Sequence, residues 1–179
     1  MICEFFAEGF EELEAIAPLD ILRRAGVEIC TVALGKTATV TGAHGVGMLC
    51  DTTEDELDLA RLEGVILPGG PGHARLAQSA VLEKALAAAN KNGGLLAAIC
   101  AAPSVLGKYG YLRGRRACCF PGYEAQLAGA TVLFDPVVTD GNVITARGAG
   151  CAAAFGLALA AYLVSQEKAE EIAGQIQCP

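Results

Sequence analysis

The sequence predicts an α/β sandwich built on a mostly parallel β-sheet. Short apolar segments alternate with longer segments of helical periodicity, and several of the short segments are apolar throughout. A strand is apolar on both sides where helices cover both faces of its sheet. Alternation of strands and helices is typical of parallel sheets, because each parallel connection needs a crossover segment.

Six segments have the composition of strands: Ile2–Phe6, Glu28–Ala33, Val46–Cys50, Gly64–Leu67, Leu95–Ile99 and Asn142–Ala146. Helical patterns cover Glu11–Ala25, Ala80–Asn92, Ala101–Leu106, Cys151–Val164 and a last segment near Glu167–Gln175. No repeat and no linker-like change in composition divides the chain, so we expect a single domain over residues 1–179.

The composition excludes several classes of protein. Hydrophobic residues make up 53% of the 179 residues and charged residues only 18%, which excludes intrinsic disorder. The formal net charge of −7 and the absence of Trp argue against a nucleic-acid-binding surface. The densest apolar stretch, Ala152–Val164, is shorter than the roughly 20 residues of a membrane span, so we expect a buried helix there and no membrane partner.

The eight cysteines favour a reducing compartment. They form no C-x-x-C pair, so no zinc ribbon or thioredoxin-type motif is predicted, and the N-terminus lacks the basic region of a signal peptide. We therefore expect a cytoplasmic protein with mostly reduced thiols. Half of the cysteines are predicted to be unreactive thiols in or near the core: Cys3, Cys30, Cys50 and Cys151.

Cys100 differs from the others because it directly follows a predicted strand and precedes a short helix. Ligand sites of parallel α/β sheets lie beyond the carboxyl ends of the strands. Pro103 suits the first turn of a helix, which would place Cys100 at or next to the helix N-cap. There the helix dipole is expected to lower the pKa of the thiol. A buried, unreactive cysteine is the alternative interpretation.

Two further positions follow predicted strands. Gly69 and Gly70, in the segment Leu67–Gly72, could bring backbone N–H groups close to a reacting centre, although an ordinary Pro-Gly turn explains the same residues. Glu14 follows the first strand among apolar neighbours, where a carboxyl group has a raised pKa and can act as an acid or base. A solvated helix N-terminus is the alternative for Glu14.

The sequence does not favour two other kinds of site, an amidotransferase triad and a dinucleotide-binding loop. The chain has two histidines, His44 and His73, and neither follows Cys100, so a Cys-His-Glu amidotransferase triad is not expected. The segment Gly148–Ala153 matches the dinucleotide fingerprint G-x-G-x-x-A, but no strand with an acidic residue follows it. We interpret these glycines as positions of close helix packing.

Four segments occur together in the order and spacing of a known family: Ala7–Glu14 (AEGFEELE), Leu67–Gly70 (LPGG), Ala98–Pro103 (AICAAP) and Thr145–Gly150 (TARGAG). Through them the chain resembles the DJ-1/ThiJ/PfpI family over nearly its whole length. Cys118–Glu124 is similar to the ThiJ-like branch. The resemblance implies a flavodoxin-like three-layer sandwich of the class I glutamine amidotransferase type, a homodimer, and no metal or organic cofactor.

The resemblance also implies roles for individual residues. Cys100 matches the nucleophilic, oxidation-sensitive cysteine of the family, and Glu14 matches the protonated glutamate that hydrogen-bonds to it. The oxyanion-hole positions correspond to Gly69, Gly70 and Ala101. His44 lies where some relatives carry a basic residue that reaches the partner's pocket, and a solvated loop histidine is the alternative.

Two functions follow from these expectations. The first is a cysteine-dependent enzyme acting on reactive carbonyls, in which a Cys100 thiolate adds to methylglyoxal or a glycated amine or thiol and Glu14 moves the proton that yields lactate. Ala101 stands where protease-type relatives have His, which argues against proteolysis. No histidine follows Pro121, where some relatives carry one in the pocket. The second function is a non-catalytic oxidative-stress sensor or chaperone-like protein, with Cys118 or Cys119 as a candidate partner for oxidised Cys100.

Overall fold

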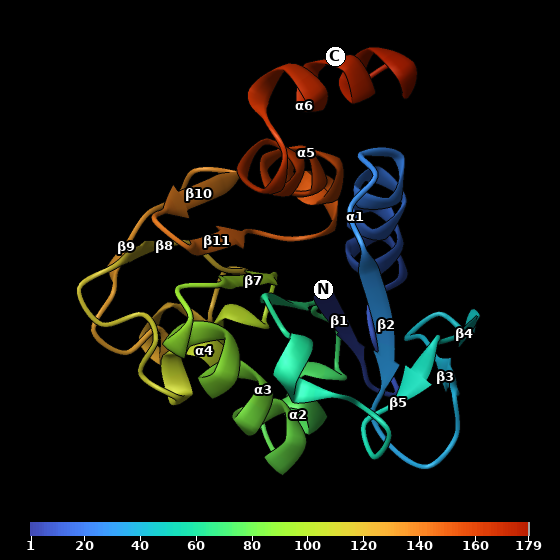
Figure 1. Ribbon diagram of the computed structural model, residues 1–179. Helices are drawn as coiled ribbons and strands as arrows, with labels where there is room; N and C mark the ends of the chain where they lie inside the picture. The colour runs from blue at the N-terminus through green and yellow to red at the C-terminus, as the bar shows by residue number, and fades with distance from the viewer. Residues whose placement is uncertain (179) are drawn as a thin grey trace.

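A computed structural model describes residues 1–178 and is built around a seven-stranded sheet with the strand order β10-β11-β7-β6-β1-β2-β5 (Figure 1). Every pair of neighbours is parallel except β10 and β11. The strands of this sheet, in chain order, are β1 (Ile2–Phe6), β2 (Ile29–Ala33), β5 (Thr52–Thr53), β6 (Gly64–Leu67), β7 (Leu95–Ile99), β10 (Val137–Asp140) and β11 (Val143–Ala146).

Helices cover both faces of the sheet, which confirms the predicted three-layer α/β architecture (Figure 1). One layer consists of α1 (Glu12–Arg24), α5 (Ala152–Leu163) and α6 (Gln166–Gln175). The other consists of α2 (His73–Leu76), α3 (Ala80–Lys91) and α4 (Pro103–Lys108). Alternate residues of the central strands enter the two resulting core clusters, as the pleat of a β-strand requires.

Most predicted elements form within two residues of their predicted bounds, but one strand lies outside the main sheet. Val46–Cys50 was expected to be a strand like the others, and only its centre, β4 (Gly47–Leu49), is extended. It pairs with β3 (Thr39–Thr41) in a separate antiparallel hairpin, where Leu49 is 73% exposed. Short apolar runs do not by themselves distinguish a buried strand from an exposed hairpin.

Several short elements have no clear sequence signal. The antiparallel edge strand β10, the first helix of the second layer, α2, and the strands β5, β8 (Arg116–Ala117) and β9 (Thr131–Val132) were not predicted. The 3₁₀ turns Leu59–Arg61, Glu124–Gln126 and Ala149–Cys151 were not predicted either. Such elements are too short to show periodicity. The predicted helix Ala101–Leu106 begins later, at Pro103, and continues to Lys108.

The two longest helices of the first layer pack closely because a glycine lies at their contact. α1 and α5 share the most extensive contact between any two helices of the described chain. A Cβ atom on Gly156 of α5 would lie 2.9 Å from the Cα atom of Pro18 and 2.8 Å from the side chain of Ile21, both in α1. Pro18 also cannot donate a hydrogen bond to the carbonyl group of Glu14, four residues earlier.

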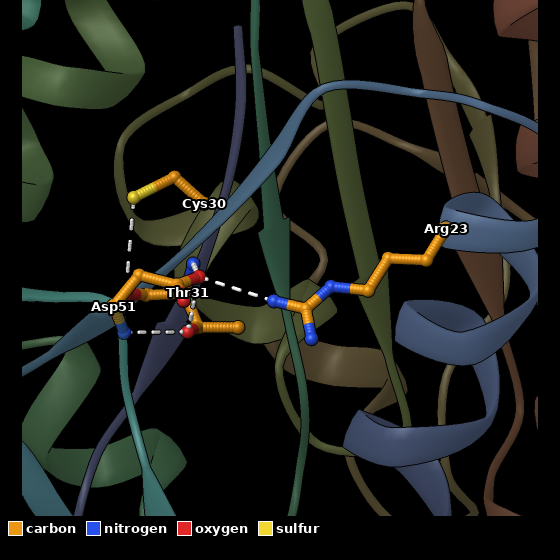
Figure 2. A network of polar contacts seen from close by, with 4 residues as sticks. All are labelled: Arg23, Cys30, Thr31 and Asp51. Carbon is orange, nitrogen blue, oxygen red and sulfur yellow. Dashed lines mark hydrogen bonds and ion pairs between the residues drawn. The ribbon is translucent and has the colours of Figure 1, made fainter.

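A polar network fixes α1 and β5 against β2. One carboxylate oxygen of Asp51 accepts hydrogen bonds from the backbone N–H and the hydroxyl group of Thr31, at 2.9 and 2.8 Å, and from Arg23 of α1 at 3.1 Å (Figure 2). The Asp51 N–H in turn donates to the Thr31 hydroxyl. Although desolvation raises the pKa of Asp51, these hydrogen-bond donors outweigh it and hold that pKa below its usual value.

No helix within residues 1–178 is long and apolar enough to cross a membrane.

We predict that Gly156→Ala lowers the free energy of unfolding by about 1–3 kcal/mol, because the new methyl group meets the Pro18 backbone at a distance that requires α1 and α5 to separate. The matched control is Gly174→Ala in α6, where nothing lies within 4 Å. There the variant should be as stable as the wild type or up to about 1 kcal/mol more stable. Urea denaturation measures both, and equal effects of the two substitutions would contradict the packing argument.

Candidate active site

All the predicted site residues except His44 meet where neighbouring parallel strands end, and Gly148 lies beside them. Glu14 lies in the first turn of α1, which follows β1, and Gly69 follows β6. Cys100 follows β7, and Gly148 follows β11. Because β11, β7, β6 and β1 are adjacent and parallel, their carboxyl ends bring these residues to one edge of the sheet.

Cys100 has a backbone conformation that non-glycine residues rarely adopt. Its φ angle is +66°, in the left-handed region, and Gln177 is the one other non-glycine residue with a positive φ among residues 1–178. Two hydrogen bonds hold this conformation: the Cys100 N–H donates to Ala146, at 2.9 Å, and the Cys100 carbonyl accepts from Phe120, at 2.8 Å. Backbone strain of this kind persists only where the surroundings fix it, and it turns the partly exposed side chain out of the sheet.

Glu14 is a buried carboxyl group directed at the Cys100 sulfur. Its residue is 1% exposed. The Gly69 N–H donates to its Oε2 at 3.1 Å, and the Ala149 N–H and the Cys100 thiol also donate to the carboxylate. The Glu11 side chain caps α1 by accepting from the Glu14 N–H at 2.8 Å, which fixes the start of the helix.

Burial changes the acidity of both groups. It raises the pKa of Glu14 to about 7, and the hydrogen bond from Cys100 opposes this rise without cancelling it. Burial, the charge of Glu14 and the hydrogen bond to it raise the pKa of Cys100 to about 12. Near neutral pH the pair therefore carries at most one negative charge, shared between the carboxyl group and the sulfur.

The prediction that the helix N-terminus lowers the pKa of Cys100 is wrong. The N-cap of α4 is Ala102, two residues after Cys100, and α4 has only six residues. The N–H groups of Gly70 and Ala101 do favour the thiolate, but burial and Glu14 outweigh them. The pair therefore keeps one proton near neutral pH, which the thiol and the carboxyl group share.

The three oxyanion-hole candidates divide into two groups. The N–H groups of Gly70 and Ala101 act on the Cys100 thiol by lowering its pKa, and their role as an oxyanion hole stays a prediction. The Gly69 N–H is instead bound to Glu14, so Gly69 positions the carboxyl group. A Cβ atom on Gly69 would lie 2.4 Å from the Glu14 carboxylate and 2.6 Å from the Cys100 Cβ atom, so only glycine fits between them.

A groove that the sequence did not reveal lies beside the pair. Its cavity has a volume of about 410 Å³ and is lined by Phe120, Pro121, Pro136 and Arg147 with the turn of residues 148–151. A Cβ atom on Gly148 would lie 3.3 Å from the Phe120 ring and 3.8 Å from the Glu14 carboxylate, which places the groove next to Glu14. Its lining comes from three separate segments of the chain, residues 120–121, Pro136 and residues 147–151, which only the fold brings together.

His44 does not join the cluster of Cys100 and Glu14 within this chain. It lies in the turn of the β3–β4 hairpin, and its exposed ring is bound to Glu12 at 2.7 Å. This contact raises the pKa of His44. His44, Glu11 and Glu12 form the one cluster among the described residues that could offer three ligands to a metal ion, but Glu11 caps α1 and Glu12 already binds His44. The role of His44 across a dimer stays a prediction.

Cys118 and Cys119 lie on the segment that precedes Phe120, but both are buried. The Cys118 thiol donates to the Thr145 carbonyl at 3.3 Å, and burial raises the pKa of both residues, that of Cys119 to about 11. Their reaction with an oxidised Cys100 stays a prediction.

A strained cysteine at the end of a parallel strand, facing a buried carboxyl group and backbone N–H donors, defines the class of α/β proteins with a nucleophile at a strand–helix turn. The family model described as "DJ-1/PfpI family" matches residues 1–162, and the chain belongs to this family.

The relatives and solved structures agree with this assignment. The chain is 38% identical to Protein dj-1beta of Drosophila melanogaster over 93% of its length and 91% of that protein. It is 33% identical to a glutathione-independent glyoxalase of Caenorhabditis elegans (92% and 89% covered) and 34% identical to a deglycase of Pyrococcus horikoshii (79% and 86%). It superimposes with a TM-score of 0.94 on a cysteine-to-alanine mutant of a DJ-1 superfamily protein from Salmonella typhimurium, which is 36% identical with 99% and 98% of the chains covered.

We predict that Glu14 makes the protein less stable as the pH rises from 4.5 to about 7. In this range the native state keeps the Glu14 proton that the unfolded chain releases, so the free energy of unfolding falls with pH. Glu14→Gln should remove this pH-dependent part of the free energy of unfolding, which amounts to roughly 3 kcal/mol between pH 4.5 and about 7. Urea denaturation at a series of pH values measures it. The buried Glu4 also has a raised pKa and contributes to the pH dependence of both proteins. The effect of Glu14 is therefore the difference between the wild-type curve and the Glu14→Gln curve. Parallel curves would contradict the prediction.

Proposed function

We propose that the protein converts small reactive 2-oxoaldehydes such as methylglyoxal into 2-hydroxy acids, or acts on the adducts that they form with amines and thiols. The observation that carries this proposal is the contact between Cys100 and Glu14, whose pKa is raised to about 7. A general base works best when its pKa lies near the working pH. A nucleophile activated by an adjacent base is the arrangement of covalent catalysis.

The first step would form a bond between sulfur and carbon. The Glu14 carboxylate accepts the thiol proton while the Cys100 sulfur attacks the aldehyde carbon of methylglyoxal, so no thiolate has to exist beforehand. The aldehyde oxygen becomes an oxyanion, which the N–H groups of Gly70 and Ala101 can stabilise because they already point toward the sulfur. The oxyanion then takes the proton from Glu14 and gives a hemithioacetal.

The next steps would move one proton between neighbouring carbons and one between their oxygens. The Glu14 carboxylate removes the hydrogen of the former aldehyde carbon, giving an enediolate, and returns it to the adjacent carbon while the hydroxyl proton passes to the oxygen of that carbon, giving a lactoyl thioester on Cys100. Water cleaves this thioester into lactate and the free thiol. The net reaction adds one water molecule to methylglyoxal and consumes no electrons. Glu14 is the group proposed for these transfers, because the ring of His44 is bound to Glu12 and that of His73 to the Gly70 carbonyl.

The names of two relatives support the proposal, since one is a glutathione-independent glyoxalase and the other a deglycase. The groove beside Glu14 also supports it. Its volume of about 410 Å³ accommodates a small carbonyl compound, and its lining is mostly apolar. Arg147, which lines the groove, could bind the carboxylate of the product.

We predict that Cys100→Ser lowers the rate of lactate formation from methylglyoxal by at least about 10³-fold, and Glu14→Gln by at least about 10²-fold, because a serine hydroxyl is a weaker nucleophile and an amide cannot accept the proton. An enzymatic assay for lactate measures the rates. Cys178→Ser, near the C-terminus, is the matched control and should keep the wild-type rate. A Cys100→Ser variant with the wild-type rate would disprove the proposed enzyme.

A second candidate function uses the same pair without turnover. Cys100 is partly exposed and faces a carboxyl group that carries a proton at and below about pH 7. Two molecules of a hydroperoxide would convert the thiol to a sulfinic acid and release two molecules of the corresponding alcohol or water. Protonated Glu14 could donate a hydrogen bond to a sulfinate oxygen, which would favour this product. The protein would then report oxidative stress.

We predict that hydrogen peroxide adds two oxygen atoms to Cys100 more readily in the wild type than in Glu14→Asp, because the shorter side chain cannot reach the sulfinate. Intact-mass spectrometry followed by peptide mapping measures the product. Ready oxidation of Cys100 together with an absence of carbonyl turnover would favour the sensor over the enzyme. Equal oxidation of the two variants would remove Glu14 from the sensor mechanism.

A further inference from the structure

Two cysteines that the sequence suggested were unreactive lie side by side on neighbouring strands. Cys3 of β1 and Cys30 of β2 are direct register partners in a parallel pair. Neighbouring strands are about 4.7–4.9 Å apart, and disulfides join residues whose Cα atoms are about 4.4–6.8 Å apart. The backbone spacing at this pair is therefore compatible with a disulfide bond.

The two side chains also point to the same face of the sheet. Cys3 belongs to the core cluster on the side of α3, and Cys30 packs against that cluster at its margin. Thr31, the next residue of β2, points to the opposite face, where its hydroxyl group binds Asp51. The Cys3 and Cys30 thiols are close enough that each shifts the pKa of the other.

Only one of the two thiols is accessible. Cys3 is fully buried, whereas Cys30 is partly exposed. The reason is that the neighbouring edge strand β5 pairs only with Val32 and Ala33, so the start of β2 has no strand on the side away from β1. Figure 2 shows the Cys30 sulfur near this uncovered part of β2, beside the backbone of Thr31, whose carbonyl oxygen is 3.9 Å away.

We propose that Cys3 and Cys30 form a reversible intramolecular disulfide when the protein meets a hydroperoxide, and that this pair is a second redox site separate from Cys100. The hydroperoxide first oxidises the exposed thiol, giving a Cys30 sulfenic acid and one molecule of alcohol or water. The Cys3 thiol then attacks the Cys30 sulfur, which releases one water molecule and forms the S–S bond. The two thiols lose two electrons and two protons in total, and the hydroperoxide is reduced by them to an alcohol or water and a second water molecule.

The position of the pair keeps it apart from the proposed active site. Cys3 and Cys30 are each the second residue of their strands, near the amino edge of the sheet. Cys100 and Glu14 lie beyond the carboxyl ends of the strands. Because the strands are parallel, the two sites are at opposite edges, and Cys100 cannot act as the partner of Cys30.

The disulfide would have a structural consequence. The bond closes the segment between residues 3 and 30, which contains all of α1 and Glu14, and restricts the unfolded chain, so oxidation should raise the Tm.

The test uses Cys100→Ser, so that oxidation of Cys100 cannot interfere. The protein is treated with hydrogen peroxide, free thiols are alkylated, and the chain is digested with trypsin, which cleaves after Arg23 and Arg24. The peptide of residues 1–23 then contains Cys3 as its one cysteine, and that of residues 25–36 contains Cys30. We expect these peptides to be joined, with the loss of two hydrogen atoms, and to separate on addition of dithiothreitol.

Matched variants identify the pair. Adding Cys30→Ser should abolish the joined peptides and the rise in Tm that peroxide causes, whereas adding Cys50→Ser should leave both unchanged. Cys50 is the control because it lies close to Cys30 in space but in the core cluster of the other face. The proposal is overturned if Cys30 becomes a sulfinic acid while Cys3 stays free. It is also overturned if Cys30 joins Cys50 or a second chain, which a non-reducing gel would show.

Discussion

The proposed chemistry depends on one constraint: a carboxyl group and a thiol share a buried site in which a second negative charge is strongly disfavoured. Water cannot reach Glu14, so its pKa rises to about 7, and the charge of Glu14 in turn raises the pKa of Cys100. A base that titrates near neutral pH can both take a proton from a thiol and return it to a substrate carbon. Burial thus provides the acid–base group that the proposed chemistry needs.

The surrounding backbone positions Glu14 and Cys100. Gly69 is small enough to lie between Glu14 and Cys100 and donates its N–H to the carboxylate. Gly70 and Ala101 direct their N–H groups at the sulfur. The left-handed conformation of Cys100 is fixed through hydrogen bonds to Ala146 and Phe120, which belong to two other segments of the chain. Strain at the nucleophile is therefore balanced by contacts from β11 and from the loop that also forms the groove.

Local patterns in the sequence predict the central strands, the long helices and the position of Cys100, because each depends on a few consecutive residues. The family resemblance added the pairing of Cys100 with Glu14, which are far apart in the chain. The pKa of Cys100 was predicted to be lowered and is raised, because the burial of Glu14 and the short length of α4 are visible only in the packed structure. For the same reason the groove at Phe120 and Arg147 and the adjacency of Cys3 and Cys30 could not be predicted: both depend on which segments become neighbours.

The central claim is that Glu14 keeps its proton up to about neutral pH. It is tested most directly by following the side-chain carboxyl carbon of Glu14 by NMR in protein labelled with ¹³C-glutamate, with Glu14→Gln used to assign the signal. A midpoint near 7 is the predicted result. A midpoint near the ordinary value of 4.5 would contradict the claim, because Glu14 would then be fully ionised at neutral pH and unable to hold and return a proton.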